Sequence, residues 1–423
     1  MSHFVINGQH PLAGELAVFG SKNAALPLLT AALLTDEPIR YHNIPPILDV
    51  KNLLPILSAL GVTVEQDAAN NSLLLRAQHL TPEALPEHQV GLLRGSILLM
   101  GALLSRTKQL RIPRPGGDLI GARPIDAHLD AFRQLGAIIS EDKGLITIDG
   151  ANLRAARIVL PEFSVTATEN ALLVAARLPG TTTIEIAAAE PHIVALANLL
   201  TSMGAKITGA GTHTITVQGS EKLQGAACTN IPDMLEAGSF ILMGVVTQSA
   251  ITVTNVPVAD LLLFFKKLNE IGVDYTIDEA AKTVSVRPGP LRAFRLQTLP
   301  HPGIATDLQA PFTVLATQAA GSSLIHDPMY EGRFRHIHEL QKMGASVIVC
   351  DPHRVIIHGP TPLHCHRIPS LDIRSGITLL MAALIAEGET IIDEAEIIDR
   401  GYASLTDRLR AIGADIVRQS DTG

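Results

Sequence analysis

The sequence has no tryptophan, few other aromatic residues and only three cysteines among its 423 residues. Because 47% of the residues are hydrophobic and only 3% are aromatic, the expected core consists of Leu, Ile, Val and Ala on regular helices and strands. Cys228, Cys350 and Cys365 lack the spacing of a disulfide framework or zinc finger, which is typical of a reducing compartment. In His364-Cys365-His366 adjacent side chains would point to opposite faces, so we expect no metal site there.

The sequence also lacks long apolar runs and an excess of positive charge. No apolar run reaches the ~18 residues of a membrane span, so no membrane insertion is expected. Residues 1–6 do not resemble a signal peptide, and a cytoplasmic location is expected. The formal net charge of −8 argues against nucleic acid as a partner. A chain of this length favours two domains, and its oligomeric state is not predicted.

A six-fold repeat organises the chain. A helical pattern ends in a glycine and a strand pattern follows at Gly61, Gly136, Gly204, Gly272, Gly344 and Gly413. Glycine at this position is typical of a left-handed helix stop. The first five glycines are each followed by two alternating runs separated by a turn, which predict β-hairpins. Each unit is therefore expected to read strand, helix, strand, helix, hairpin.

The two ends of the chain complete each other. The sixth unit stops after Ala414–Arg418 and lacks its second hairpin strand, whereas residues 4–8 and 16–20 resemble that strand and the next one. We therefore expect two three-repeat domains, 22–229 and 1–21 plus 230–423, with the active site in the cleft between them. A single continuous solenoid is the alternative, but it would not need its first strand to complete its last repeat.

Charged residues stand at equivalent positions of the repeats. Ser164, Asp233 and Thr306 at expected helix starts have a ready interpretation as N-caps. Lys22, Arg94 and Arg374 do not, because a cation at a helix N-terminus is unfavourable unless an anion lies nearby. Loops after the middle strands add Arg123, Arg333 and Arg400. Guanidinium groups bind carboxylate and phosphate through paired hydrogen bonds, so these residues together predict a site for a small anion.

The segment from Arg111 to Asp126 is a loop by composition, with three prolines and three glycines. It follows a strand-like run, Gln109–Ile112, and precedes a helical pattern that begins at Ile125. It carries one acid, Asp118, and one guanidinium, Arg123, and is suited to closing over an anionic substrate. An ordinary surface loop is the alternative.

Four motifs resemble those of the UDP-N-acetylglucosamine enolpyruvyl transferase family. They are Ser-Lys-Asn-Ala-Ala-Leu-Pro at 21–27, Pro-Gly-Gly-Asp-Leu-Ile-Gly-Ala-Arg-Pro at 115–124, Ala-Thr-Asp-Leu-Gln-Ala at 305–310 and Ile-Asp-Arg-Gly-Tyr at 398–402. The resemblance runs nearly end to end. It implies an inside-out α/β barrel in two domains and the first committed step of peptidoglycan synthesis. In that step the enolpyruvyl group of phosphoenolpyruvate moves to the 3-hydroxyl of UDP-N-acetylglucosamine, phosphate is released, and no metal or organic cofactor takes part.

The resemblance also implies residue roles. Lys22 and Asn23 would hold phosphoenolpyruvate, Arg123 and Arg400 its phosphate, and Arg333 and Arg374 its carboxylate. Asp307 would accept the 3-hydroxyl proton, and Asp118 would be the proton donor. The expected substrate contacts further include Arg94, Pro124, Ile125, Asp126, Ala127, Glu162, Phe163, Ser164, Val165, Met329 and Asp372.

Several positions depart from the family pattern. Asp118 stands where most members have cysteine, and an aspartate donates a proton only if its pKa is raised. Glu162, Met234 and Ile397 replace residues that are often basic or imidazole, and Thr166 replaces a usual glycine. Two alternatives remain open. One is a 5-enolpyruvylshikimate-3-phosphate synthase-like enzyme, against which the glycine loop argues, and the other is a non-catalytic paralogue that binds the UDP-sugar.

Overall fold

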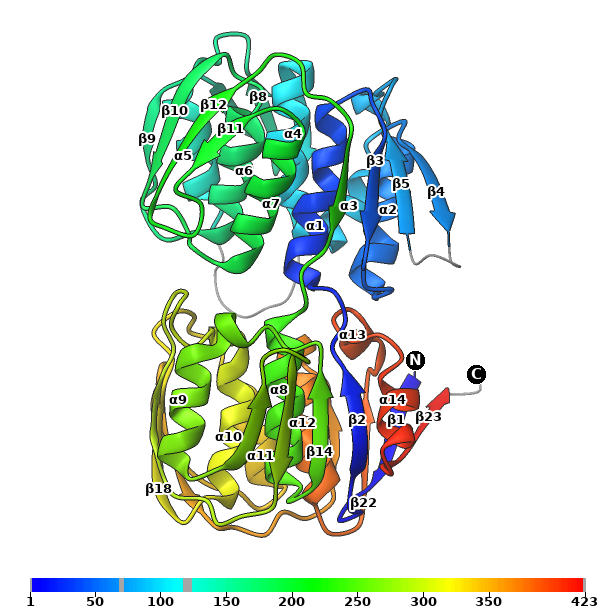
Figure 1. Cartoon of the computed structure of the whole chain (residues 1–423), viewed down its shortest axis with the longest axis vertical. Helices are drawn as coiled ribbons and strands as arrows, with labels where there is room; N and C mark the ends of the chain where they lie inside the picture. The colour runs from blue at the N-terminus through cyan, green and yellow to red at the C-terminus, as the bar shows by residue number, and fades with distance from the viewer. Residues whose placement is uncertain (1, 68–71, 117–123, 421–423) are drawn as a thin grey trace. The chain divides into compact units, whose positions relative to one another are not determined.

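The computed structural model describes residues 2–67, 72–116 and 124–420, which form two compact units. The first unit comprises the described residues of 20–231, and the second unit comprises residues 2–19 together with 232–420. In each unit, helices occupy the interior and small sheets lie around them (Figure 1). This arrangement of small sheets around helices agrees with the α/β fold that the resemblance implies.

The described residues of each unit form three sheets. In the first unit the strand orders are β13(Ala226–Thr229)-β3(Ile39–His42)-β5(Ser72–Arg76)-β4(Thr63–Asp67), β6(Gln109–Pro113)-β8(Leu145–Asp149)-β7(Ile138–Asp142) and β11(Lys206–Thr208)-β12(Thr214–Gly219)-β10(Gly180–Glu185)-β9(Arg157–Val159). In the second unit they are β15(Asp274–Asp278)-β16(Thr283–Arg287)-β14(Ala250–Thr254)-β2(Ala13–Ala17), β17(Arg295–Gln297)-β18(Gly321–His326)-β20(Arg354–Gly359)-β19(Ser346–Asp351) and β21(Arg367–Pro369)-β22(Glu389–Asp393)-β1(Ser2–Asn7)-β23(Asp415–Ser420). All five predicted hairpins are present.

The helices divide into inner and outer sets. The inner α-helices are α1(Lys22–Thr30), α4(Leu98–Thr107), α6(Val165–Ala175), α8(Met234–Val246), α10(Gln309–Gln318) and α12(Ile373–Ile385). The outer ones are α2(Leu48–Ala59), α5(Asp126–Gln134), α7(Pro191–Ser202), α9(Leu262–Ile271), α11(His336–Lys342) and α14(Leu405–Ala411), and α3(Glu87–Leu92) and α13(Glu396–Asp399) are short additions. Every residue of α8 from Leu235 onward is buried, as expected of a helix that is apolar all round.

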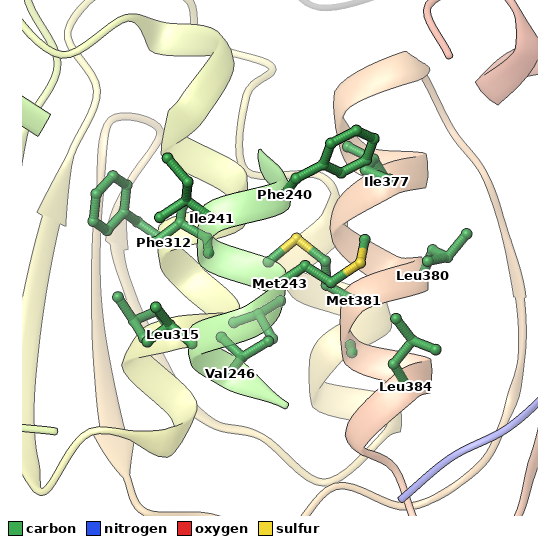
Figure 2. Close-up of a cluster of buried hydrophobic side chains, with 14 of the residues drawn as sticks. Phe240, Ile241, Met243, Val246, Phe312, Leu315, Ile377, Leu380, Met381 and Leu384 are labelled. Carbon is green, nitrogen blue, oxygen red and sulfur yellow. The ribbon is translucent and has the colours of Figure 1, made fainter. Parts of the chain in front are cut away.

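The core of the second unit lies where α8, α10 and α12 meet. From α8, Phe240 points toward α12 and Ile241 toward α10 (Figure 2). Phe312 of α10 and Met381 of α12 are fully buried. Phe312 also packs edge-on against Phe264 of α9, with ring centroids 5.6 Å apart. Burying aromatic and aliphatic surface of this extent supplies most of the stability of such a unit. The starts of α10 and α12, beside which Asp307 and Arg374 lie, are therefore held by one packed core.

The repeat glycines end their helices as predicted. Gly61, Gly136, Gly204, Gly344 and Gly413 have φ between 93° and 113°, and Gly272 has φ 89°. A residue with a Cβ is strained in this left-handed region, which is why a glycine recurs there. The first five glycines thus turn an outer helix into the following hairpin, and Gly413 turns α14 into β23.

The N-terminal strands pair as the sequence pattern predicts. β1 pairs antiparallel with both β22 and β23, with Phe4 opposite Ile392 and Arg418. β2 runs parallel to β14, with Leu16 opposite Val253. The last repeat therefore obtains its missing strand from the first residues of the chain.

Two helix starts differ from the sequence prediction. Arg94 lies in a 3₁₀ turn, Arg94–Ile97, and α4 begins only at Leu98. Thr306 lies in a second 3₁₀ turn, Thr306–Leu308, and the prediction that it caps a helix is wrong, because the cap position is Ala305 and no side chain caps the turn. The Thr306 hydroxyl donates to Asp327 Oδ2 at 2.5 Å. The buried carboxylate of Asp327 is a strong acceptor and holds the Thr306 hydroxyl there. Ser164 and Asp233 do cap α6 and α8, as predicted.

Candidate active site

The predicted site residues divide between the two units, and each set is described within its own unit. The second unit holds Asp307, Met329, Arg333, Asp372, Arg374 and Arg400, and the first unit holds Lys22, Asn23, Arg94, Pro124, Ile125, Asp126, Ala127, Glu162, Phe163, Ser164 and Val165. Asp118 and Arg123 lie outside the described residues.

In the second unit, the Asp307 carboxylate lies between two arginines. Arg333 Nη2 donates to Oδ1 at 2.6 Å and Arg374 Nε donates to Oδ2 at 3.0 Å. The side chains of Arg333 and Arg374 are 9% and 8% exposed, whereas that of Asp307 is 21% exposed. Because two guanidinium groups face one carboxylate, this cluster is suited to a further anion. The structure thus joins three of the predicted residues.

Helix and ring contacts hold Arg374 in place. Asp372 caps α12, and its Oδ1 accepts the backbone N–H of Arg374 at 2.9 Å. The guanidinium of Arg374 lies over the Tyr402 ring, 5.9 Å from its centroid, and Nη1 donates to the Tyr402 hydroxyl at 3.3 Å. Burial lowers the pKa of Arg374, but Asp307, Tyr402 and Asp233 raise it more, and the net pKa is above the ordinary value. Arg374 is therefore a fixed positive charge.

One buried hydrogen-bond donor of Arg333 has no acceptor among the described residues. Its Nε is buried and has no hydrogen-bond partner among the residues that the structure describes. The same guanidinium lies 5.1 Å from the centre of the Tyr330 ring. A buried donor without a partner is unfavourable, and a bound carboxylate is the kind of acceptor that satisfies it.

The remaining candidates of the second unit lie on turns. Met329 is 37% exposed, and its N–H donates to Asp327 Oδ1 at 2.9 Å. Arg400 ends α13 and is half-buried. Its neighbour Asp399 pairs with Arg418 at 2.7 Å. The buried Asp327 therefore fixes the turn that presents Met329.

In the first unit, Lys22 is the first residue of α1 and pairs with a buried acid. Its Nζ lies 2.9 Å from Asp49 Oδ2, and the side chains are 13% and 3% exposed. Ser21 caps the helix by accepting the N–H of Ala24 at 3.3 Å, and Asn23 follows Lys22 in the first turn. Asp49 was not predicted as a site residue, because an acid in the first turn of a helix, here α2, has an ordinary interpretation as a complement to the helix dipole.

These pairs explain why a cation is tolerated at the N-terminus of two helices. Asp49 is a counter-ion of Lys22, and Asp307 is a counter-ion of Arg374. Carboxylates of the chain itself therefore stand where the sequence alone indicated an external anion. A cation at a helix start is therefore weaker evidence for a bound ligand than the sequence suggested. The two guanidinium groups around the single carboxylate of Asp307 are stronger evidence.

The other candidates of the first unit lie before α5 and α6. Pro124 and Asp126 are exposed, and Ile125 and Ala127 are buried, at the start of α5. Before α6, Glu162 and Phe163 are exposed, and the Ser164 hydroxyl accepts the N–H of Ala167 at 3.4 Å. Val165 opens the helix. The Phe163 ring lies 4.6 Å from that of His213, so an aromatic surface adjoins the free amides of a helix N-terminus.

Comparison with known proteins decides the family. A UDP-N-acetylglucosamine 1-carboxyvinyltransferase of Koribacter versatilis is 41% identical over 99% of this chain and 96% of its own length. The corresponding enzyme of Halothermothrix orenii is 41% identical over 98% and 99%. The chain belongs to the UDP-N-acetylglucosamine 1-carboxyvinyltransferase family. Residues 6–409 also match the broader family model of EPSP synthase (3-phosphoshikimate 1-carboxyvinyltransferase).

Solved structures of two other enzymes have the same fold as this carboxyvinyltransferase family member. The enolpyruvyl transferase NikO of Streptomyces tendae superposes with a TM-score of 0.89 at 27% identity, over 99% of both chains. An EPSP synthase of Acinetobacter baumannii superposes with a TM-score of 0.74 at 19% identity, over 99% of this chain and 100% of its own, and shows the fold alone. In the part of the chain that the structure describes, none of the helices has the length and hydropathy of a membrane-spanning segment.

Proposed function

We propose that this protein transfers the enolpyruvyl group of phosphoenolpyruvate to the 3-hydroxyl of UDP-N-acetylglucosamine with release of phosphate. The observation that carries the proposal is the 41% identity, over nearly the whole length of both chains, to enzymes named for this reaction. The Asp307 cluster supports it, because a reaction on a doubly anionic donor needs fixed cations.

The cluster gives a reason why phosphoenolpyruvate binds before Asp307 takes the proton. While Arg333 and Arg374 both bind Asp307, its two carboxylate oxygens accept hydrogen bonds from the guanidinium groups, and these bonds oppose the transfer of a proton to either oxygen. The carboxylate of phosphoenolpyruvate competes for the same guanidinium groups, so its binding would release Asp307. Asp307 then takes the proton of the 3-hydroxyl as this oxygen attacks C2 of phosphoenolpyruvate, and C3 is protonated by the general acid.

The remaining roles are part of the same proposal. Lys22 and Asn23 hold phosphoenolpyruvate, Arg123 and Arg400 its phosphate, and Asp118 protonates C3. Arg94, residues 124–127, residues 162–165, Met329 and Asp372 serve UDP-N-acetylglucosamine and the surrounding site. The domain boundaries 22–229 and 1–21 plus 230–423, with substrates bound between the domains, likewise remain a prediction. Fixed cations then stabilise the tetrahedral intermediate, which keeps both the carboxylate and the phosphate.

Phosphate release tests the proposal directly. The purified protein is incubated with phosphoenolpyruvate and either UDP-N-acetylglucosamine or shikimate 3-phosphate, and inorganic phosphate is measured. We expect release only with the UDP-sugar, and none from a Lys22→Met variant. Release only with shikimate 3-phosphate would establish the EPSP synthase-like alternative. Binding of the UDP-sugar without release would establish the non-catalytic paralogue.

A further inference from the structure

The second unit contains a cavity of about 430 Å³ that α9 and the strands β17 and β18 line together. Its apolar walls are five aliphatic side chains, namely those of Leu263, Leu296, Leu299, Ile304 and Leu324. None of the lining residues is among the candidates for the active site. A volume of this size is typical of sites that bind small molecules, so the cavity is a candidate for a second ligand.

The charged side chains in the lining of this cavity have one sign. Lys267 of α9 and Arg295 of β17 contribute to it, and the described lining includes no aspartate or glutamate. Lys267 already pairs with Glu270 of its own helix, whereas Arg295 has no ion pair with an acid in the described part of the chain. Because the chain as a whole has a net charge of −8, a cavity with only basic side chains is a local exception, and it favours an anionic group.

The strand β17 adds backbone donors beside Arg295. It is at the edge of its sheet and runs parallel to β18, and the N–H of Thr298, which follows it, donates to the His326 carbonyl at 3.1 Å. Alternate residues of an edge strand bond to the neighbouring strand, so the N–H groups of Arg295 and Gln297 point away from β18. A guanidinium and two backbone donors therefore lie on the same short strand in the cavity lining.

We propose that this cavity binds a small amphiphile, with its apolar part against the aliphatic walls and one carboxylate or phosphate group at Arg295. The walls favour a ligand with an apolar part over a simple ion, because only apolar surface gains free energy by leaving water there. Leu299, which is 43% exposed, would be covered by such a ligand. Ile304 immediately precedes Ala305 and the turn that carries Asp307, so the ligand would contact the segment that leads into the candidate active site.

Octanoate is a suitable probe, because it joins an apolar alkyl chain to a carboxylate. It is titrated into the full chain labelled with ¹³C at the methyl groups of Ile and Leu, and the Ile304 signal is assigned with an Ile304→Val variant. We expect this signal to shift saturably, with a dissociation constant on the order of 1 mM. Octylamine and octanol, which have the same chain without the negative charge, should bind at least about tenfold more weakly. Octyl phosphate separates the two anionic groups, since tighter binding than octanoate would identify phosphate and weaker binding carboxylate.

Arg295→Gln tests the anchor of the anionic group. The side chain is exposed, so the variant should fold normally, and we expect the dissociation constant of octanoate to rise roughly fivefold. Arg287→Gln is the matched control, because Arg287 is also an exposed strand arginine of the second unit and should leave binding unchanged. An Ile304 signal that does not shift, equal binding of octylamine and octanoate, or unchanged binding in Arg295→Gln would overturn the inference. Phosphate release plays no part in these measurements, so they do not depend on the proposed function.

Discussion

Arg374 Nε donates to Asp307 Oδ2 at 3.0 Å, which joins two helix starts that are 67 residues apart in the chain. Arg333 binds the other oxygen of the same carboxylate. Both oxygens of the Asp307 carboxylate therefore accept hydrogen bonds from guanidinium groups. The cluster therefore links the proposed base to the proposed binding site for the carboxylate of phosphoenolpyruvate.

Replacing Asp307 tests its role as a base. Asp307→Asn keeps the size of the side chain but cannot accept the 3-hydroxyl proton, so we expect kcat for phosphate release to fall by a factor of about 100 or more. Asp274→Asn is the control, since Asp274 pairs with Arg287 in the hairpin of β15 and β16 and should leave kcat unchanged. An Asp307→Asn variant with normal kcat would exclude the base assignment.

The Lys22–Asp49 pair predicts a selective effect on one substrate. Asp49→Asn removes a counter-ion that orients Lys22, so we expect the KM for phosphoenolpyruvate to rise about tenfold while that for the UDP-sugar stays constant. Because the pair is nearly buried, the free energy of unfolding should also fall by about 3 kcal/mol. Asp36→Asn, which breaks an exposed pair with Arg106 in the same unit, should change neither KM. Equal changes in both KM values would contradict this role of Asp49.

The chemistry of position 118 is predicted from the sequence alone. Asp118→Asn has no acidic proton, so turnover should be lost, whereas Asp118→Cys should retain it. The wild type has no thiol at this position and should resist epoxide inhibitors such as fosfomycin, and Asp118→Cys should become sensitive. Mass spectrometry provides the check: a covalent adduct on the wild type at Asp118 would refute the prediction.

His336 predicts a loss of stability in acid. Burial lowers its pKa to about 4 from 6.5, although the charge of Asp372 acts in the opposite direction. Between these two values the unfolded chain binds a proton that the folded chain does not, so the free energy of unfolding rises with pH, by about 1.4 kcal/mol per pH unit. The contribution is complete above pH 6.5 and is lost as the pH falls toward 4.

The comparison with His336→Gln isolates this contribution. Urea unfolding followed by circular dichroism, at pH of about 4.5 and about 7, should show a smaller difference for the variant than for the wild type. Circular dichroism suits a chain without tryptophan. The same pH dependence in both proteins would show that His336 titrates normally in the fold.

Much of the fold was predictable from local patterns. The six glycines and the five hairpins follow from rules that act within a few residues, namely the left-handed helix stop and the alternation of strands. The pairing of β1 with β23 was predictable because the repeat lacked one strand and residues 4–8 resembled it. The prediction that Arg94 stands at the start of an α-helix was wrong, because a 3₁₀ turn and a helix start share the same residue preferences over so few positions.

The site was predictable as a set of residues but not as a set of contacts. Motifs indicated Lys22, Asp307, Arg333 and Arg374, but no local rule pairs Lys22 with Asp49 or predicts that Asp307 is shared between two arginines. Asp49 and Tyr402 each had an ordinary interpretation, as a helix-start acid and a motif aromatic. Their roles appear only from contacts between elements far apart in the chain.

The sequence by itself determined the repeat, the positions of the helix stops and the chemical types of the site residues, because these depend on backbone preferences and side-chain chemistry over short spans. Only the tertiary structure decided which charges neutralise one another and which polar side chains share hydrogen bonds. Those outcomes depend on burial and on distances between separate helices, and both are set when α1, α2, α4, α5 and α6 pack together in one unit, and α10, α11 and α12 in the other.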